Sequence, residues 1–498
     1  MPSSFASVQH IVVVMLENHS FDHLLGFLYA EKNSQPPLNL PAHTQPTYDG
    51  LLPPDVTDLF WCPSNADYFS GSDPQKVFAT RGTDTFTLPD PDPNELFPNF
   101  TYQLFGPATD IAPGKIPEMK GFLVDYQTAK GSSPDLAKRI MQMYSPEKLP
   151  VLSQLARNYA VSDAWFASVP AQTWPNRAFL HTGTSRGMVT NGNIFAYRTQ
   201  TIFDVLKKVG KSWNVYTDSQ LLSLTKAMYP LLEWALGHFR TFAQFQSDAQ
   251  AGTLPQYTFL EPAFVYQPED EAPTHDVRLG EQFLWKIWKA VSTGPHWSGT
   301  LLVILFDEHG GCYDHVPPPW GAAIPDAESE TKQPGFRFDR FGVRVPAVVV
   351  SPLIEAGTVF RSPTDVPLDH TTILATLRDW LQITGESMLA SKRVAMAPTL
   401  EFLLTRDEAR TDLPDITPHA VAVKAAPGVP TVAEDDMPLS DLQFSMAVAT
   451  EEDSQQRDLT GAEIQQLRQR VWTKKHLRQH VHDAASRKRA AGREPNTR

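Results

Sequence analysis

The sequence is poor in cysteine. Its 498 residues include two cysteines, Cys62 and Cys312. Two cysteines cannot build a framework of several disulfides or a cysteine-rich zinc site, although they leave both a single disulfide and a reduced pair open. A chain of this length can bury a large core without disulfides or a structural metal. The class of small disulfide-stapled domains is therefore excluded.

Long hydrophobic runs are also absent. The apolar run at residues 10–16 is too short to cross a bilayer, no basic region precedes it, and no small-residue cleavage site lies before Glu17. We therefore expect neither a signal peptide nor a transmembrane helix. This expectation favours a cytoplasmic location or secretion by a leaderless route, and a leader outside the given sequence stays open.

Positive charge is scarce over most of the chain. There are 43 Lys and Arg residues against 56 Asp and Glu residues, and the net charge is −13. An acidic protein binds nucleic acid poorly, so we expect no nucleic-acid partner. The charge is uneven, because residues 459–498 hold ten Lys and Arg against three Asp and Glu, a net charge of +7.

Short apolar runs rich in β-branched residues recur along the chain, and helical patterns lie between them. The runs are Ile11–Leu16, Leu301–Phe306 and Val345–Val350. Such runs are typical of strands that are buried on both faces of a parallel sheet. Residues 276–291 and 371–381 carry apolar side chains about four positions apart, as one face of a helix does. The sequence predicts an α/β fold with a mostly parallel central sheet flanked by helices.

Composition divides the chain into three parts. We expect a catalytic domain over residues 1–405, with loop-rich insertions at about 31–115 and 220–275. Residues 406–458 are rich in Pro, Ala and acids, and we interpret them as a linker-like segment. A capping-box pattern at Thr460 and Glu463 then begins a basic amphipathic helix and tail over residues 459–498. That helix packs on the body, contacts a membrane surface or associates with a second copy of the chain.

Polar residues follow two of the predicted strands. Glu17 and Asn18 come directly after the first run, and Asp307 and Glu308 come after the second. In open parallel sheets, ligands bind beyond the carboxyl ends of the strands. Carboxylate and amide oxygens suit Ca, Mg, Mn or Zn. One pair alone could simply cap a helix, but two pairs favour a site for a divalent metal ion.

The second acidic pair lies in the segment FDEHGGCYDHVPPP, residues 306–319. Its two adjacent glycines permit a tight turn directly after the acids. His309, Asp314 and His315 add further potential ligands or proton carriers. This density of titratable side chains marks the segment as a functional loop.

A third segment, SDAWFASVPAQTWPNR (162–177), places Thr173 between two prolines. Asn176 then opens a predicted helix. A hydroxyl at a helix N-terminus lies where backbone N–H groups and the helix dipole favour an anion. Metal coordination can activate such a hydroxyl as a nucleophile. A role as a cap or turn residue is the alternative for Thr173.

These segments occur in the same order as in a known family. They are ENHSFDHLLG (17–26), SDAWFASVPAQTWPNR, FDEHGGCYDHVPPP, FGVRVPAVVVSPLIEAGTV (341–359) and LDHTTIL (368–374). Over roughly residues 8–400 the chain resembles the bacterial and fungal phosphoesterase family, which includes phosphatidylcholine-preferring phospholipase C and an acid phosphatase. The resemblance implies an alkaline-phosphatase-like fold and metal-assisted hydrolysis of a phosphoester.

The resemblance also implies roles for individual residues. Thr173 matches the nucleophile, which would pass through a phosphothreonine intermediate. The two strand-end pairs match the metal ligands, namely Glu17, Asn18, Asp307 and Glu308. Three histidines match catalytic histidines of the family: His275, His315 and His370. Histidines that must be charged, with a pKa near 6.5, would give a mildly acidic pH optimum.

Two positions depart from the family pattern. His275 lies in a Pro-Thr-His order where the family has His-Pro, and His19 stands where many members have Arg. His19 lies directly beside the expected ligands, so it can alter the contacts to phosphate.

Aromatic residues near these segments bear on the substrate. We expect Trp165 and Trp174, with Asn176, to contact it. A choline headgroup could bind among Trp165, Phe166, Trp174, Tyr257 and Tyr266 by cation–π attraction, although core packing explains each of them equally well. The basic C-terminal helix could provide peripheral contact with a membrane.

The preferred interpretation is a metal-dependent hydrolase of the phospholipase C type that acts on a phospholipid such as phosphatidylcholine. An acid phosphatase for soluble phosphomonoesters and a non-catalytic binding protein are the alternatives. The segment around Thr173 argues against a sulfatase, because sulfatases need Cys or Ser where this chain has Thr173. The sequence leaves the identity of the metal, the natural substrate and the oligomeric state open.

Overall fold

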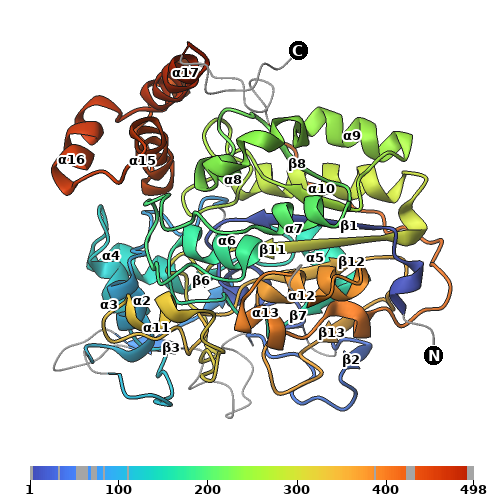
Figure 1. Cartoon of the computed structure of the whole chain (residues 1–498). Coiled ribbons are helices and arrows are strands. Elements are labelled where there is room, and N and C mark those ends of the chain that lie inside the picture. Colours follow the sequence, from blue (N-terminus) through green and yellow to red (C-terminus); the bar gives the residue numbers. More distant parts are fainter. Residues whose placement is uncertain are drawn as a thin grey trace.

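The computed structural model describes residues 4–31, 34–51, 66–68, 76–81, 85–108, 111–385, 388–421 and 432–490. Its centre is a nine-stranded sheet with the strand order β2-β13-β7-β12-β11-β1-β10-β8-β9 (Figure 1). In that order the strands are Leu38–Leu40, Thr358–Phe360, Ala160–Ser162, Ala347–Val350, Thr300–Phe306, His10–Leu16, Tyr257–Leu260, Trp213–Thr217 and Phe239–Thr241.

The sheet is parallel except at one strand. β12 runs antiparallel to both of its neighbours, β11 and β7. The predicted α/β fold with a mostly parallel sheet is therefore confirmed, and all three apolar runs form strands. The third run, β12, nevertheless points the opposite way. The sequence could not predict this, since a continuous run of β-branched residues indicates burial on both faces and carries no information on strand direction.

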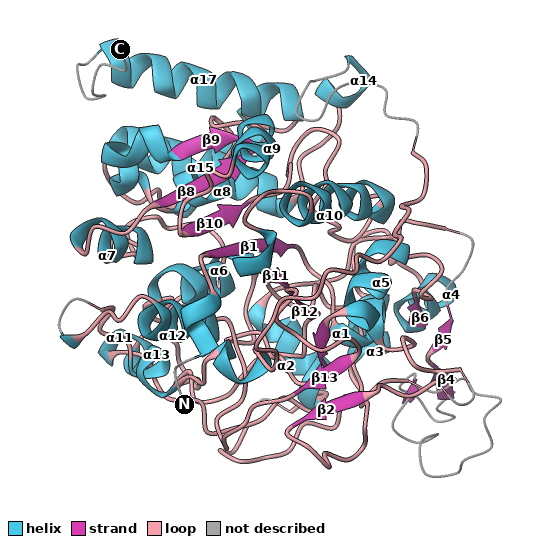
Figure 2. Cartoon of the chain, turned by 90° about the vertical axis from the view of Figure 1, so that its right-hand side faces the viewer, coloured by secondary structure: helices cyan, strands magenta, loops and turns pink. Residues whose placement is uncertain are grey.

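Helices cover both faces of the sheet (Figure 2). One face carries α5 (Pro150–Asn158) and α10 (Val277–Ser292), and the other carries α6 (Thr173–Thr182), α7 (Ile202–Lys208) and α12 (Thr371–Trp380). α10 and α12 are the two helices predicted from apolar spacing. α9 (Phe242–Ala251) packs beside α10 at the β9 end of the sheet.

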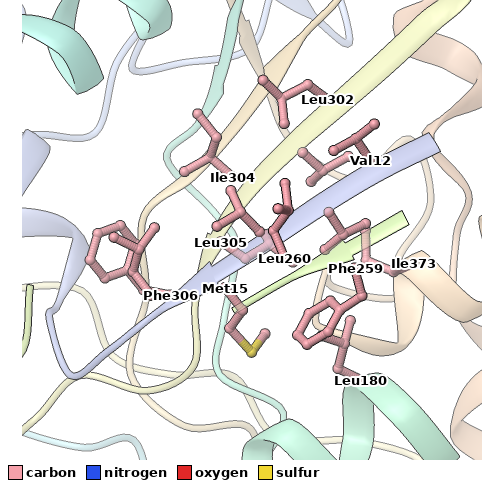
Figure 3. Packing of buried hydrophobic residues seen from close by; sticks show 14 of the residues in the cluster. Val12, Met15, Leu180, Phe259, Leu260, Leu302, Ile304, Leu305, Phe306 and Ile373 are labelled. Atoms are coloured by element: carbon pink, nitrogen blue, oxygen red, sulfur yellow. The ribbon is translucent and has the colours of Figure 1, made fainter. Parts of the chain in front are cut away.

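The core lies between these layers. The central strands β1 and β11 are almost entirely buried along their length. Figure 3 shows Met15, Phe259 and Leu305 from three neighbouring strands, together with Leu180 of α6. Burying side chains of this size stabilises the fold by about 1.5–3 kcal/mol each. This packing fixes α6 against the strand ends that carry the polar residues.

The expected insertions contain regular elements where they are described. The first holds α2 (Phe97–Phe105) and the short pair β3 (Ala66–Tyr68) and β4 (Lys76–Phe78). Residues 220–275, expected to be loop-rich, hold α8 (Leu224–Met228), β9, α9 and β10. These strands have three and four residues, so their apolar runs are too short to stand out in a sequence.

Further short elements complete the body outside the central sheet. They are α1 (Phe21–Leu25), α3 (Phe122–Gln127), α4 (Pro134–Ala137), β5 (Thr80–Arg81), β6 (Gln142–Met143), α11 (Ala327–Thr331) and α13 (Lys392–Met396).

The C-terminal part is a cluster of helices on one side of the molecule (Figure 1). It consists of α14 (Val432–Asp435), α15 (Asp441–Gln455), α16 (Gly461–Arg470) and α17 (Lys474–Ala490). The predicted capping box at Thr460 and Glu463 is present and begins α16. The single basic helix expected here is divided in two between residues 470 and 474. The segment expected to be linker-like contains α15, while its residues 422–431 lie outside the described part.

Within the described ranges, no helix combines the length and the apolarity that crossing a bilayer requires.

Candidate active site

Two strand ends meet at the centre of the site. β1 and β11 are neighbours, and their register pairs Leu16 with Phe306, so the residues that follow each strand lie side by side. The backbone N–H groups of Asn18 and Glu308 both donate to Oδ1 of Asp307, at 3.0 and 2.8 Å. The structure thus brings together the two polar pairs that the sequence singled out.

Thr173 faces these strand ends from α6. The helix begins at Thr173, three residues before the predicted start at Asn176. The Thr173 hydroxyl lies 3.1 Å from Oε2 of Glu17 and 3.3 Å from Oδ1 of Asn18, and it can donate to either oxygen. Thr173 is fully buried. Its hydroxyl therefore lies at a helix N-terminus, in contact with two of the four predicted metal ligands.

Arg177 is a member of the site that the sequence analysis did not identify. Its Nε donates to Oε1 of Glu17 at 2.9 Å, its Nη2 contacts the same oxygen, and Nη2 also donates to the carbonyl of Met15 at 3.0 Å. Nε lies 3.9 Å from Oδ2 of Asp307. The signal was present, because Arg177 lies four residues after Thr173 on the same face of a helix.

The acidic groups are crowded and shielded from water. Burial raises the pKa of Glu17 well above its usual range, against the opposing effect of Arg177 and with further raising by Asp307. Burial also raises the pKa of Glu308, and the carboxylates of Glu95 and Asp307 raise it further. The guanidinium of Arg177 alone therefore does not offset the negative charge of these carboxylates.

The donor set fits a hard divalent cation. Oδ2 of Asp307 and Oε1 of Glu308 are buried without a hydrogen-bond partner. Oε2 of Glu17 and Oδ1 of Asn18 face the Thr173 hydroxyl. Oxygen ligands of this kind suit Ca²⁺, Mg²⁺ or Mn²⁺, and a cation would offset the mutual repulsion of the acids.

Two other groups of potential ligands lie nearby among the described residues, and neither contains Glu17, Asn18, Asp307 or Glu308; the second includes Asp314 and His315, which the sequence offered as further potential ligands. Each has three ligand atoms within 4.8 Å of one another: His19, His23 and Cys312 in one, and Asp22, Asp314 and His315 in the other.

Glu95 is a second residue that the sequence did not reveal. Nδ2 of Asn18 donates to Oε1 of Glu95 at 2.6 Å, which orients the Asn18 oxygen toward Thr173. Asn18 has a φ of 56°, a left-handed conformation that Asn tolerates better than most residues. Because Glu95 lies in the loop-rich first insertion, nothing in its local sequence marks it.

A cavity of about 470 Å³ opens beside Asn18. Its lining includes Asp92, Glu95, Gln172, His275, Asp441 and Arg468. Gln172 precedes Thr173, so the cavity reaches the N-terminus of α6. The cavity is thus bordered by Asn18, which contacts the Thr173 hydroxyl, and by the residue that precedes Thr173.

His275 reaches this cavity. Its Nδ1 lies 2.7 Å from Oδ1 of Asp270, and the backbone carbonyl of Asp270 accepts a hydrogen bond of 2.9 Å from the N–H of Glu17. His275 is thus linked to the strand end through Asp270, even though its sequence context departs from the family pattern.

His370 lies behind Asp307. Its Nε2 donates to the backbone carbonyl of Asp307 at 2.6 Å, and its Nδ1 accepts from Nε1 of Trp165 at 3.4 Å. Burial lowers the pKa of His370, with the Asp307 carbonyl opposing this effect. Both ring nitrogens are engaged, so His370 holds the backbone of a predicted ligand and does not face the cavity.

His315 belongs to a separate ion network. Its Nδ1 lies 2.6 Å from Oδ2 of Asp22 and its Nε2 lies 3.2 Å from Oδ1 of Asp49. Burial opposes the charged form, but these two carboxylates raise the pKa of His315 to about 10. These carboxylates favour the protonated imidazole, so His315 does not support the expected mildly acidic optimum, which stays a prediction.

Arg344 completes the same network. It donates to Asp22 at 2.9 Å and to Asp314 at 3.0 Å, and all three side chains are buried. The carboxylate oxygens of Asp22 and Asp314 are thus engaged by Arg344, by His315 and by the backbone N–H of Asp22, so the network ties these loops together.

The residues predicted to contact substrate are engaged in contacts within the protein. Asn176 donates to the carbonyl of Ala171 at 2.7 Å and accepts from the N–H of Val169 at 3.1 Å, which fixes the turn before Thr173. Trp165 and Trp174 are fully buried. Sequence proximity placed them near the site but could not show which way they point.

The aromatic residues that could hold a choline headgroup lie away from the lining of this cavity. None of Trp165, Phe166, Trp174, Tyr257 and Tyr266 lines the cavity beside Asn18. Of the described residues that line it, the aromatic one is Phe264. Tyr266, for example, donates to Asp435 on the C-terminal helices at 2.9 Å.

The C-terminal helices form one wall of the cavity. Arg468 of α16 donates to Asp441 of α15 at 3.0 Å, and its guanidinium lies 4.1 Å from the ring centre of Phe444. Arg468 and Asp441 both line the cavity. A segment that the sequence marked as linker and tail thus contributes to the site.

Comparisons with known proteins found a family and several relatives. The profile of the Phosphoesterase family matches residues 8–384. The chain is 32% identical over 461 residues to non-specific phospholipase C3 of Arabidopsis thaliana, covering 90% of this chain and 82% of the relative. It is 34% identical over 454 residues to non-specific phospholipase C1 of the same plant, covering 88% and 78%.

More distant similarities were also found. Non-hemolytic phospholipase C of Pseudomonas aeruginosa is 25% identical over 464 residues, covering 84% of this chain and 60% of the relative. Among solved structures, a Vibrio parahaemolyticus protein in the alkaline phosphatase superfamily matches with a TM-score of 0.32 and 10% identity, over 59% of this chain and 80% of that one.

Proposed function

Because the chain belongs to the Phosphoesterase family, we propose that it is a phospholipase C-like phosphoric diester hydrolase that uses Thr173 as its nucleophile on a phospholipid. The observation that carries this proposal is the contact of the Thr173 hydroxyl with Glu17 and Asn18, beside an open cavity. The names of the curated relatives supply the class of substrate.

The chemistry begins at the Thr173 hydroxyl. Its oxygen forms a bond to phosphorus while its proton passes to Oε2 of Glu17, the carboxylate oxygen 3.1 Å away. Arg177 holds Glu17 in place for this transfer. The positive end of the α6 dipole favours the phosphate charge at this position.

The leaving group departs on the cavity side. The bond from phosphorus to the glycerol oxygen breaks, and this oxygen needs a proton. His275 can give it from Nε2, since Asp270 holds its Nδ1. The phosphorylated Thr173 still carries the headgroup. Water then attacks phosphorus and gives one proton to His275, while the bond from phosphorus to the threonine oxygen breaks and this oxygen takes back the proton held by Glu17.

A divalent cation bound by Glu17, Asn18, Asp307 and Glu308 would neutralise charge on phosphate and threonine oxygens. The two unpartnered oxygens of Asp307 and Glu308 support this assignment.

The cavity favours a headgroup with a positive amine. Its lining contains four acidic side chains, those of Asp92, Glu95, Asp270 and Asp441. The Lys and Arg side chains in the lining are fewer, namely Lys130 and Arg468. Complementary charge attracts a zwitterionic choline or ethanolamine headgroup over an anionic one. This recognition replaces the aromatic cage that the sequence suggested.

The test compares two substrates with matched variants. We expect wild-type enzyme to release phosphocholine from phosphatidylcholine vesicles faster than it hydrolyses a soluble aryl phosphate. Thr173→Ala should lose turnover of both by at least about 10³-fold while keeping the wild-type circular dichroism spectrum. Dialysis against a strong chelator should also abolish turnover, and added divalent metal should restore it.

Three other results would contradict the proposal. Rapid hydrolysis of the aryl phosphate with an inert phospholipid would identify an acid phosphatase. Hydrolysis of neither substrate by folded, metal-loaded protein would identify a non-catalytic binding protein. Full activity of Thr173→Ala would remove Thr173 from the mechanism.

We further propose that the C-terminal helices contact the lipid surface. Trp472, between α16 and α17, is 55% exposed, and basic side chains of both helices surround it in sequence. Exposed Trp and cationic side chains together favour an anionic membrane surface.

A further inference from the structure

Three buried side chains converge on one point behind the candidate active site. The Nδ1 atoms of His19 and His23 lie 2.9 Å apart, and Sγ of Cys312 lies 3.4 Å from Nδ1 of His19. All three side chains are fully buried. Their ligand atoms lie within 4.8 Å of one another.

The local fold aims these atoms at each other. His19 follows the end of β1 and His23 lies four residues later on α1, with the two rings stacked at 4.7 Å between their centres. Ser20 caps α1 and donates to the carbonyl of Tyr313 at 2.6 Å. This bond holds the loop after β11, and with it Cys312, against the start of α1.

Hydrogen bonds alone leave this cluster unsatisfied. The backbones of Glu271 and Gln142 lie close to the rings of His19 and His23, but no hydrogen bond of good geometry forms at Nε2 of either buried ring. If both rings carry their proton on Nε2, two Nδ1 lone pairs face each other at 2.9 Å. If one ring carries it on Nδ1, that ring buries an unpaired acceptor, which costs about 1–3 kcal/mol. A cation among the three atoms converts the lone-pair contacts into bonds.

We propose that His19, His23 and Cys312 bind a second metal ion, a borderline or soft divalent ion such as Zn²⁺. Imidazole nitrogen and thiolate sulfur are the donors that Zn²⁺ prefers. Tetrahedral Zn²⁺, with bonds of about 2.0–2.3 Å, sets its ligand atoms about 3.3–3.6 Å apart. The two Nδ1 atoms would therefore move apart by a few tenths of an ångström, while Sγ of Cys312 already lies at such a distance from Nδ1 of His19. Binding releases the thiol proton of Cys312.

This site is distinct from the oxygen-rich site, and it does not depend on the proposed function. Its ligands are nitrogen and sulfur, whereas Glu17, Asn18, Asp307 and Glu308 offer only oxygen. Its position gives it a structural role, because His19 adjoins Asn18 and Cys312 lies four residues after Glu308. The bound ion cross-links the two loops that carry the predicted catalytic ligands.

The test uses the full-length protein loaded with Co²⁺ in place of Zn²⁺. A thiolate ligand gives Co²⁺ an intense near-ultraviolet charge-transfer band, which oxygen ligands do not produce. We expect this band in wild type and in the control Cys62→Ser, and its loss in Cys312→Ser. Elemental analysis should show one metal equivalent fewer in Cys312→Ser than in Cys62→Ser.

A second measurement needs no variant at the site. X-ray absorption at the zinc edge of Zn²⁺-loaded Cys62→Ser should show a sulfur neighbour at about 2.3 Å. A spectrum that contains only oxygen and nitrogen neighbours of zinc would overturn the proposal, even if Cys312→Ser failed to fold. An equal cobalt band in Cys312→Ser and wild type would overturn it as well. Loss of hydrolysis with the sulfur signal intact would count against the proposed function only.

Discussion

The hydroxyl of Thr173 lies 3.1 Å from Oε2 of Glu17, although the two residues are 156 positions apart in the sequence. The contact arises because α6 begins, at Thr173, next to the residues that directly follow the end of β1 at Leu16. One buried guanidinium, that of Arg177, then locks the carboxylate from the other side. The account of function depends on this arrangement.

Arg177 should be essential for both stability and turnover. Arg177→Met leaves the buried Glu17 carboxylate without its cation, which should lower the free energy of unfolding by about 3–5 kcal/mol. Chemical denaturation and kcat measure the two effects. The control is Arg337→Met, since Arg337 pairs with Glu330 at the surface and such pairs contribute less than about 1 kcal/mol. Equal losses in both variants would contradict the assigned role.

Gly310 should tolerate no side chain. A Cβ atom at this position would lie 2.1 Å from the backbone oxygen of Asn18, and the residue has a φ of 57°. Gly310→Ala should therefore displace Asn18 and abolish turnover. Gly335→Ala is the control, because its φ is 72° and its Cβ would meet nothing within 4 Å, so it should cost about 1–2 kcal/mol and leave kcat unchanged. An active Gly310→Ala enzyme would show that Asn18 can move without loss.

Stability should fall in alkaline solution because of His315. Its pKa is raised to about 10 in the folded protein, against about 6.5 when unfolded. The protonated, paired imidazole therefore contributes fully below pH 6.5, and its contribution declines as pH rises from 6.5 through about 10. Wild type should lose on the order of a few kcal/mol between pH 6.5 and 10. His315→Gln should be less stable at pH 6.5 and should show a flatter profile; a parallel decline in both would refute the assignment.

The sequence predicted the central elements of the fold and part of the site. β1, β11, α10 and α12 could be predicted because their apolar spacing is long and regular. The pairing of Glu17 with Asp307 followed from the rule that parallel strands end at one edge. Glu95 and Asp441 could not be predicted, since tertiary packing alone brings these surface-like acidic residues to the cavity. The direction of β12 and the burial of Trp165 were likewise set by long-range packing.

Trp472 should matter on vesicles and not in solution. Trp472→Ala removes an exposed aromatic side chain from the α16–α17 junction, so binding to anionic vesicles should weaken several-fold. Sedimentation with vesicles measures binding, and a short-chain monomeric phospholipid measures intrinsic kcat/KM. Met396→Ala is the control, because Met396 is equally exposed but lies on α13. Unchanged vesicle binding in Trp472→Ala would exclude this junction as the membrane contact.

The most direct measurement is to trap the covalent intermediate. Wild-type enzyme is mixed with phosphatidylcholine, quenched in acid within one turnover and analysed by peptide mass spectrometry. The account predicts a mass increase of one phosphoryl headgroup on the peptide that contains Thr173, located at Thr173 by fragmentation and absent from Thr173→Ala. Turnover with no adduct at Thr173, or an adduct on another residue, would contradict it.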